Sequence, residues 1–186
     1  MWEGLPTRLE GGLVTLEALA PEHENGLRAA GAEPQVWRWM RVSDVDSWLE
    51  LMRRSSDHPF AILQGGVPVG SSSYLSIAPE HRRLEIGNTW MSPSTWGTGA
   101  NVEAKYLLMQ HAFEELGCIR VEFKTDARNE RARAALAALP SQFEGIHRKH
   151  MLVRGDVRRD SAWYSVIDDE WPEVKATLER RLVAKR

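Results

Sequence analysis

The chain has 186 residues, a formal net charge of −2 and a pI near 6.3. That length suits a single domain, 1–186, with a core large enough to need no disulfide or metal. The acidic balance argues against a general nucleic-acid binder, which would need a clustered basic face. The apolar runs fall far short of the roughly 20 residues that cross a membrane, and the first four residues lack a signal-peptide pattern. We therefore expect a cytoplasmic protein with neither nucleic acid nor membrane as a partner.

The first half of the chain predicts a strand, two helices and an antiparallel set of strands. Val14, Leu16 and Ala18 share one face of the first strand. The Gly65-Gly66 pair is typical of a tight turn between two strands. In chain order, the predicted elements are a strand at 13–19, helices at 22–30 and 45–54, and strands at 60–64, 67–77 and 83–91.

A glycine-rich loop, Trp96-Gly97-Thr98-Gly99-Ala100-Asn101, separates the strand ending near Met91 from an amphipathic helix that runs to about Glu115. Its glycines permit positive-φ turns, so that successive backbone N–H groups converge just ahead of the helix. The first helical turn adds free N–H donors and the positive end of the helix dipole. The loop therefore predicts a phosphate site, and a plain connector is the alternative. The absence of Gly-Lys-Ser/Thr and of a third glycine argues against a P-loop or a dinucleotide site.

The helix after this loop carries one apolar stripe, and Gly117 ends it. Glu103 and Lys105 are expected to decorate its exposed side, where Glu103 also suits the positive N-terminal end. The stripe consists of Val102, Tyr106, Met109, Phe113 and Leu116.

The last third predicts three more strands and two helices. Asn129 can cap an alanine-rich helix that Pro140 ends. The strands are expected at 118–125, 142–153 and 161–167, and the closing helix at 171–184. Antiparallel strands that cross over to further strands through a helix indicate a mixed α/β (α+β) fold.

The cysteine and the histidines predict no metal site. Cys118 opens an apolar strand, where a buried and unreactive thiol is expected. His147 and His150 lie in an extended segment, which would place them on opposite faces of a sheet.

The order of elements and these residues together resemble the GCN5-related N-acetyltransferase (GNAT) superfamily, and within it the RimJ/RimL-type branch of ribosomal-protein alanine N-acetyltransferases. The resemblance runs from about Leu13 to Val183 and implies a mostly antiparallel central sheet with one splayed parallel pair and flanking helices. The segments that carry it are Glu85-Ile86-Gly87, the run from Gly97 to Lys105, the run from Arg120 to Asp126 with Asn129, and Glu144-Gly145 with Arg159-Asp160.

The resemblance implies acetyl-CoA as the cofactor and acetyl donor, with no metal. Loop N–H groups would hold the diphosphate, backbone groups of Trp90 and Met91 would face the pantetheine arm, and Asn129 would lie near that arm. Arg131 belongs to a group of arginines that either meet the coenzyme phosphates or face solvent. The predicted cofactor-binding residues are Trp90, Met91, Trp96, Gly97, Thr98, Gly99, Ala100, Asn101, Asn129 and Arg131.

Several features depart from the family pattern, among them the glycine motif and the position of Ala132. The glycine motif begins with Trp96 and ends with Asn101, where the family usually has Gln or Arg and Gly or Ala. Both replacements leave the backbone N–H donors of the loop unchanged. Ala132 stands where the branch often has a serine proposed to protonate the departing thiolate, and alanine has no proton to give.

Acetyl transfer to an amine needs a proton acceptor and donors aimed at the developing oxyanion. We expect Glu85 to be the general base, acting through a water, with its pKa raised by partial burial. A carboxylate that faces solvent or pairs with Arg83 or Arg120 is the alternative. The predicted acceptor pocket consists of Trp37 and Trp39, which otherwise close the core, and of Tyr164 and Ser165 on a late strand.

The sequence thus predicts an N-acetyltransferase that moves an acetyl group from acetyl-CoA to a primary amine, either a protein N-terminus or a small molecule. A non-catalytic acyl-CoA-binding module on the same fold is the alternative, which Ala132 keeps open. The resemblance also leaves a homodimer open, because relatives are often dimers.

Overall fold

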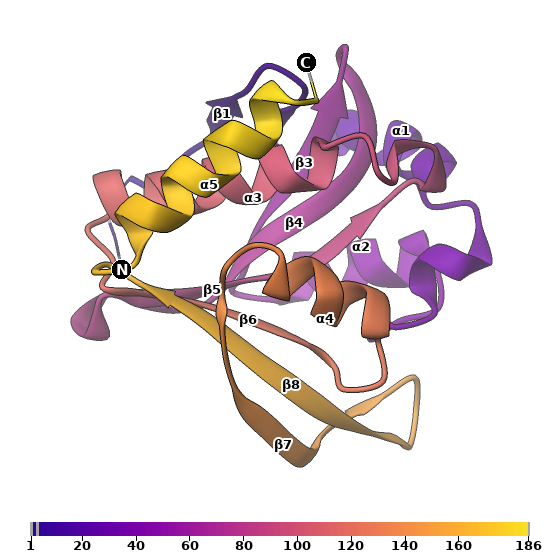
Figure 1. The fold of residues 1–186 in the computed structure, drawn as a ribbon. Helices are drawn as coiled ribbons and strands as arrows, with labels where there is room; N and C mark the ends of the chain where they lie inside the picture. Colours follow the sequence, from indigo (N-terminus) through magenta and orange to yellow (C-terminus); the bar gives the residue numbers. More distant parts are fainter. Residues whose placement is uncertain (1, 3, 186) are drawn as a thin grey trace.

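The computed structural model describes residues 2 and 4–185, so residues 1, 3 and 186 of the predicted 1–186 domain lie outside the described residues. Within the described residues, eight strands form one sheet in the order β1-β2-β3-β4-β5-β6-β8-β7 (Figure 1). Neighbouring strands are antiparallel except for β5 and β6, which are parallel. The predicted class, a mostly antiparallel sheet with one parallel pair and flanking helices, is confirmed.

The elements lie close to their predicted positions. The strands are β1 (Arg8–Glu10), β2 (Thr15–Ala18), β3 (His58–Gln64), β4 (Val67–Ala78), β5 (Arg83–Met91), β6 (Arg120–Asp126), β7 (Gln142–Val153) and β8 (Val157–Ile167). The helices are α1 (Glu24–Ala30), α2 (Val45–Arg54), α3 (Ala100–Gln110), α4 (Glu130–Ala137) and α5 (Trp171–Val183). The sequence did not predict β1, which is too short to show an alternating pattern. A π-helical turn, His111–Glu115, extends α3 to the predicted end of the helix.

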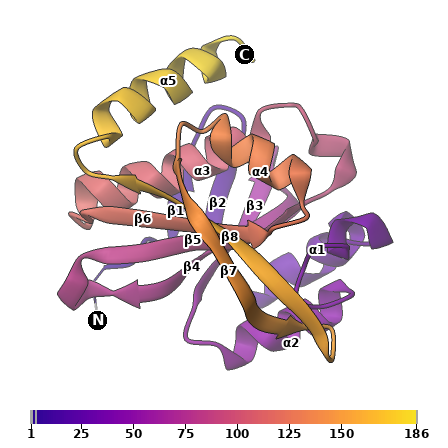
Figure 2. The same cartoon turned by 60° about the horizontal axis from the view of Figure 1, so that its bottom comes forward.

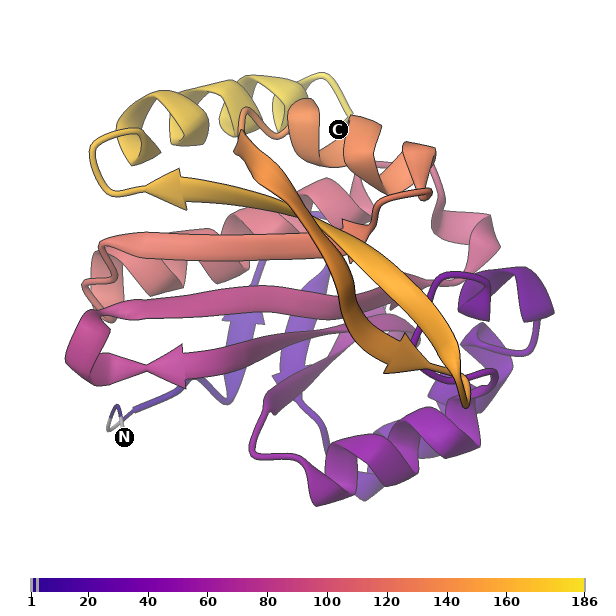
Figure 3. The ribbon, with the colours of Figure 1, turned by 90° about the horizontal axis from the view of Figure 1, so that it is seen from below.

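The helices cover both faces of the sheet (Figures 1 and 3). Helices α3, α4 and α5 lie on one face, where the larger hydrophobic core packs Leu108 and Leu178 against strand residues such as Val121. Helices α1 and α2 lie on the other face, over a smaller core that contains Trp48 and Trp90. Both cores adjoin β5, so this strand is held from both sides.

Helix α3 is buried more widely than its predicted stripe, because it lies between the sheet and α5. Tyr106, a stripe residue, is half-buried, and its hydroxyl donates to Glu179 of α5 over 2.9 Å. Glu103 and Lys105, which we expected on an exposed side, are only 1% and 9% exposed. The expectation of an exposed position was therefore wrong for both charged residues.

The buried carboxylate of Glu103 fixes the turn between β1 and β2. Its oxygens accept N–H bonds from Gly12 (3.0 Å), Leu13 (2.6 Å) and Val14 (2.8 Å). Backbone N–H groups that donate to a carboxylate form charge-assisted bonds, which are stronger than neutral ones. Glu103 therefore ties the N-terminal strands to the helix that follows the glycine loop.

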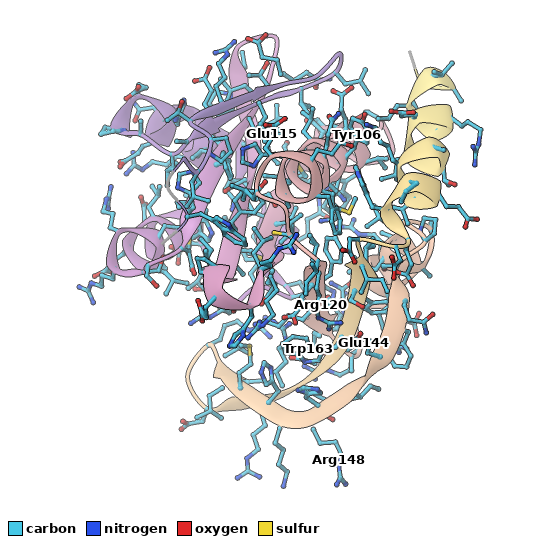
Figure 4. The ribbon with its side chains drawn as sticks, turned by 90° about the vertical axis from the view of Figure 1, so that its left-hand side faces the viewer. Tyr106, Glu115, Arg120, Glu144, Arg148 and Trp163 are labelled. Carbon is cyan, nitrogen blue, oxygen red and sulfur yellow. The ribbon has the colours of Figure 1, made fainter. Side chains whose placement is uncertain are left out.

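Strands β7 and β8 form a long hairpin that bends toward α1 and α2 (Figure 2). At its tip the backbone N–H of Arg154 donates to the carbonyl of Arg41 over 3.1 Å, and the Arg154 guanidinium donates to the carbonyl of Arg38. Figure 4 shows Arg148 pointing away from the outer side of the hairpin and Trp163 on its inner side. The hairpin tip thus joins the segment between α1 and α2 at one end of the sheet.

Candidate active site

The parallel strands β5 and β6 pair over a short stretch and then diverge. Their register joins only Arg83 to Arg120, Leu84 to Val121 and Glu85 to Glu122. Beyond Glu85, β5 continues to Met91 beside β4, and β6 continues to Asp126 beside β8. The described residues show no pairing across this divergence, which confirms the predicted splayed pair.

A cavity of about 550 Å³ occupies the divergence. Its walls come from both strands, the glycine loop, the first turns of α3 and α4, the end of α5 and the segment between α1 and α2. Eight of the ten predicted cofactor residues line it, namely Trp90, Met91, Trp96, Gly97, Gly99, Asn101, Asn129 and Arg131. Thr98 and Ala100 do not; the Thr98 hydroxyl instead donates to the Thr95 carbonyl over 2.7 Å and accepts from Ala100 N at 3.3 Å.

The glycine loop presents free backbone donors to this cavity. Gly97 and Gly99 have φ angles of +79° and +99°, which favour glycine because it lacks a Cβ. Within the described part of the chain, the N–H groups of Gly97, Gly99, Asn101 and Val102 make no hydrogen bond. Free donors at the N-terminus of a helix form an anion site.

Two cations add positive charge at the loop. The Lys185 ammonium donates to the Gly97 carbonyl over 3.0 Å. The Arg131 guanidinium lies 3.7 Å from the centre of the Trp96 ring, a cation–π contact that holds it over the loop. We call the free N–H groups and these cations the anion end of the cavity.

Asn129 and Ala132 form the wall at the start of α4. The Asn129 side-chain oxygen accepts the N–H of Ala132 over 3.1 Å and so caps the helix, as predicted. Both residues line the cavity. At the position where the family branch often has a serine, this chain therefore presents the methyl side chain of Ala132 to the cavity.

Glu85 lies where β5 and β6 part. Its side chain is 0% exposed, its Oε2 lies 2.8 Å from the Lys124 ammonium, and both residues line the cavity. Its Oε1 has no hydrogen-bond partner among the residues that the structure describes. Burial raises the pKa of Glu85 above its ordinary value, and the charge of Lys124 opposes the rise. The structure thus pairs Glu85 with Lys124, whereas the sequence suggested Arg83 or Arg120, which instead pair with Glu122.

Gly87 leaves the space that the Glu85 carboxylate fills. A Cβ at Gly87 would lie 2.8 Å from Glu85 Oε1 and 2.7 Å from the Leu75 Cδ1 methyl. Both distances are too short for ordinary contacts. A glycine two residues after Glu85 is therefore needed for the Glu85 carboxylate to occupy this position.

Lys105 reaches the middle of the cavity from α3. Its ammonium lies 3.5 Å from the Thr89 hydroxyl and 5.8 Å from the centre of the Phe123 ring. No carboxylate of the described residues pairs with it. Burial lowers the pKa of Lys105 from 10.5 to about 8. The apolar periodicity of this helix in the sequence did not indicate the burial of Lys105.

We expect Lys105→Met to stabilise the ligand-free protein. A pKa near 8 means that the folded state disfavours the ammonium, and methionine keeps the packing without the charge, so we expect a gain of about 1–3 kcal/mol at pH 7. Between pH 8 and 10.5, the contribution of Lys105 to the wild-type free energy of unfolding should rise. In this range the folded protein has lost the Lys105 ammonium proton, whereas the unfolded chain still holds it. Denaturant titrations should show a difference between the proteins that shrinks over this range. Equal stability at every pH would contradict the assignment.

The predicted acceptor residues fall in different places. Trp39 lines the cavity beside Met40. Trp37 is buried in the smaller core, where its indole N–H donates to the Gly31 carbonyl over 2.8 Å and its ring lies 4.9 Å from that of Trp90. The structure thus brings only Trp39 of this pair to the cavity.

Tyr164 and Ser165 lie away from the cavity wall. The Tyr164 hydroxyl accepts from Arg133 at 3.2 Å, and the Ser165 hydroxyl donates to Glu144 over 2.7 Å. Glu144 also pairs with Arg120 across the strands, as Figure 4 shows. These side chains are engaged within the sheet, so we do not include them in the candidate acceptor site.

The histidine prediction was wrong. His147 and His150 do not lie on opposite faces, since their rings are 5.7 Å apart and both contact Trp163. The strand register shifts between His147 and Met151, and Lys149 has a φ of 49°, so a bulge turns the intervening residues. Cys118 is buried as predicted, and burial raises its pKa to about 12.

Several polar cavity residues were not predicted as site residues from the sequence. Asn88 Nδ2 is a buried polar atom without a partner in the described chain, as is Oδ1 of the predicted residue Asn101. Such atoms in a cavity wall favour a polar ligand. The cationic cavity residues outside the predicted site are Arg41, Lys105, Lys124, Arg159, Arg181 and Lys185.

Comparisons with known proteins agree with this geometry. The family model described as "Acetyltransferase (GNAT) domain" matches residues 14–139. The protein named "Putative ribosomal N-acetyltransferase YdaF" of Bacillus subtilis (strain 168) is 31% identical over an alignment of 172 residues that covers 85% of this chain and 93% of that protein.

Among the residues described, no helix is both long and apolar enough to span a membrane.

Solved structures show the same fold. A crystal structure of a "putative acetyltransferase" from T. thermophilus has a TM-score of 0.90 and 41% identity, covering 98% of this chain and 100% of that one. Mycobacterium smegmatis RimJ, solved in complex with CoA-disulfide, has a TM-score of 0.76 and 22% identity, covering 96% and 92%. That second likeness supports the fold alone.

The site is thus a cavity between splayed strands with an anion end at a glycine loop, and the comparisons define the class of protein as an acetyltransferase. The chain belongs to the GNAT acetyltransferase family, whose members use acetyl-CoA. The expected resemblance to this family is thereby confirmed.

Proposed function

We propose that the protein transfers an acetyl group from acetyl-CoA to a primary amine in the cytoplasm. The observation that carries the proposal is the shared cavity, in which the free N–H groups of Gly97, Gly99, Asn101 and Val102 lie at one end and the buried Glu85 carboxylate at the other. The acceptor is a small molecule or a protein N-terminus.

The residues present fit the coenzyme. The anion end supplies N–H donors and the cations Arg131 and Lys185 for phosphate groups. Along the cavity, Asn88, Asn101 and Lys105 offer buried polar atoms to the amides of a pantetheine arm. When bound, acetyl-CoA supplies the activated acetyl group.

Glu85 would take the proton from the amine. A raised pKa makes this carboxylate a better base than an exposed glutamate, and its Oε1 is free of protein partners in the described chain. Lys124 holds the other oxygen in place. Ala132 supplies no acid for the leaving thiolate, so water serves there. A thiolate is a good leaving group, which makes this loss tolerable.

A loop variant tests the coenzyme site. Gly97→Ala places an L-residue at a φ of +79°, which shifts the loop N–H groups, and we expect about tenfold weaker coenzyme A binding by calorimetry. Gly66→Ala is the matched control, because Gly66 has a φ of +81° and, like Gly97, has open space for a Cβ. Equal affinities for the two variants would contradict the site.

A thiol-release assay with acetyl-CoA tests the reaction itself, against a panel of amines and N-terminal peptides. Turnover of any primary amine supports the proposal. A non-catalytic binding module would bind the coenzyme but turn over no acceptor. At a coenzyme concentration of a hundred times Kd, binding should raise the free energy of unfolding by about 2.7 kcal/mol. That stabilisation without turnover would refute the proposed reaction in favour of the binding module.

A further inference from the structure

The end of the cavity opposite the glycine loop carries an excess of positive charge. Arg41, Lys124, Arg159 and the carboxylate of Glu85 line this end, which we call the acceptor end. The Lys124–Glu85 ion pair is neutral as a unit. Two guanidinium groups therefore remain without a balancing carboxylate in the cavity wall.

Arg159 is buried without a partner. It lies on β8, its residue is 7% exposed, and its Nε is fully buried without a hydrogen bond. Across the described residues, its side chain makes neither a hydrogen bond nor an ion pair. A buried guanidinium left in this state is costly, so an unfilled anion site is the direct explanation.

The neighbouring carboxylates are engaged elsewhere. Asp126 accepts two bonds from the Arg128 guanidinium, from Nε at 3.0 Å and from Nη2 at 2.9 Å. Asp160 accepts the backbone N–H of Lys149 at 2.6 Å. Asp126 and Glu85 attract Arg159 only through space. None of the described carboxylates therefore neutralises Arg159 by contact.

Arg41 faces the same space and repels Arg159. Both residues line the cavity, and the charge of Arg41 adds to burial in lowering the pKa of Arg159. The contact between the Arg154 N–H and the Arg41 carbonyl holds the backbone of Arg41 at the hairpin tip. Two guanidinium groups that converge on one cavity suit a carboxylate, because each can donate two parallel N–H bonds to it.

This charge balance restricts the amine that can enter. A simple ammonium would meet the buried and unpartnered Arg159 guanidinium, together with the exposed Arg41, before reaching Glu85. The repulsion from the buried charge is unfavourable, because little water screens it. An amine that carries its own carboxylate brings the missing negative charge. Its amine would then face Glu85 while its carboxylate faces the guanidinium groups.

We propose that the acceptor is a small amine bearing a carboxylate, an amino acid in the simplest case, whose carboxylate is bound by Arg159 and Arg41. This inference rests on the proposed function and names the substrate class of the same cavity. The apolar side chains of Trp39, Met40 and Met151 line the cavity near these arginines and would contact the rest of the acceptor.

The test compares matched acceptors. The standard L-amino acids and their carboxamides are assayed with acetyl-CoA in the thiol-release assay, together with N-terminal peptides. For the preferred amino acid, we expect kcat/KM to exceed that of its carboxamide by about 10- to 100-fold, because a hydrogen bond to a charged group is lost. Equal rates for acid and carboxamide, or a preference for uncharged peptides, would overturn the inference.

Three arginine variants separate this role from a structural one. Arg159→Gln should raise KM for the amino acid about 10- to 100-fold, leave kcat within a few-fold, and change the carboxamide little. Arg158→Gln is the control, because Arg158 is the exposed neighbour on the same strand and its change in net charge is identical. Arg159→Lys should restore part of the discrimination. An equal loss for acid and carboxamide in Arg159→Gln would show that Arg159 only supports the fold.

Calorimetry on the coenzyme A-bound protein distinguishes the two proposals. Amino-acid binding that depends on Arg159, without turnover, would refute the proposed reaction and keep the anion site. Turnover of amines that lack a carboxylate, with no dependence on Arg159, would keep the reaction and refute this inference. No binding and no turnover would refute both.

Discussion

Glu85→Gln is expected to lower kcat/KM by about 10²- to 10⁴-fold, the usual contribution of a positioned general base. The amide has nearly the shape of the carboxylate, so the cavity and coenzyme binding should persist while the proton acceptor is lost. Because burial raises the pKa of Glu85, wild-type kcat/KM should fall as the pH drops through a value above the ordinary 4.5. The variant should lack this acidic limb. Steady-state kinetics across pH, with the coenzyme Kd measured in parallel, provide the check.

Glu122→Gln is the matched control. Glu122 stands beside Glu85 in the strand register but does not line the cavity. Its charge helps to raise the pKa of Glu85, so the control should keep the acidic limb and shift it slightly toward lower pH. If Glu85→Gln retains wild-type kcat/KM over the whole pH range, Glu85 has no part in proton transfer.

Glu103→Ala is expected to lower the free energy of unfolding by about 3–5 kcal/mol. The substitution leaves the N–H groups of Gly12, Leu13 and Val14 without their acceptor in a partly buried site. For a chain of this length, such a loss lowers the melting temperature by about 10 °C. Calorimetry or denaturant titration measures it.

Glu115→Ala serves as the control for this prediction. Glu115 lies in the π-helical turn that continues α3 and is exposed (Figure 4), so its removal should change stability by less than about 0.5 kcal/mol. A loss in Glu103→Ala no larger than in Glu115→Ala would mean that the three N–H groups find other partners. Glu103→Gln, which keeps one acceptor oxygen, should fall between wild type and Glu103→Ala.

Most of the fold could be predicted because local patterns agree with the tertiary structure. Helix α2 begins and ends as predicted, since Asp44 caps it and the apolar spacing is regular. Strand β5 also matches at both ends. The burial of Glu103 and Lys105 could not be predicted. Periodicity indicates one buried face, whereas α3 packs against both the sheet and α5.

The two ends of the cavity differed in how far the sequence could predict them. The anion end depends on Gly97, Gly99 and the helix that follows, which are contiguous, so local rules suffice. The acceptor end brings together Arg41, Glu85 and Arg159, which are far apart in the chain. The bend of the hairpin places Arg159 there. A bulge in the same hairpin is the reason that His147 and His150 do not point to opposite faces of the sheet, as strict alternation would require. Such juxtapositions arise from strand register and curvature, which one sequence does not display.

Strands β5 and β6 are paired over only three residues and diverge beyond them, with the candidate coenzyme cavity between the diverging parts and Glu85 at the last pair. Lys124 and Glu85 form a short and largely buried ion pair between the strands at that point, at 2.8 Å, whereas the pair of Arg83 and Glu122 is longer, at 3.5 Å, and more exposed. Any change that widened or narrowed the opening would therefore swing the base relative to the bound donor. The contacts between the strands at this point therefore help to fix how accurately the base and the acetyl donor meet.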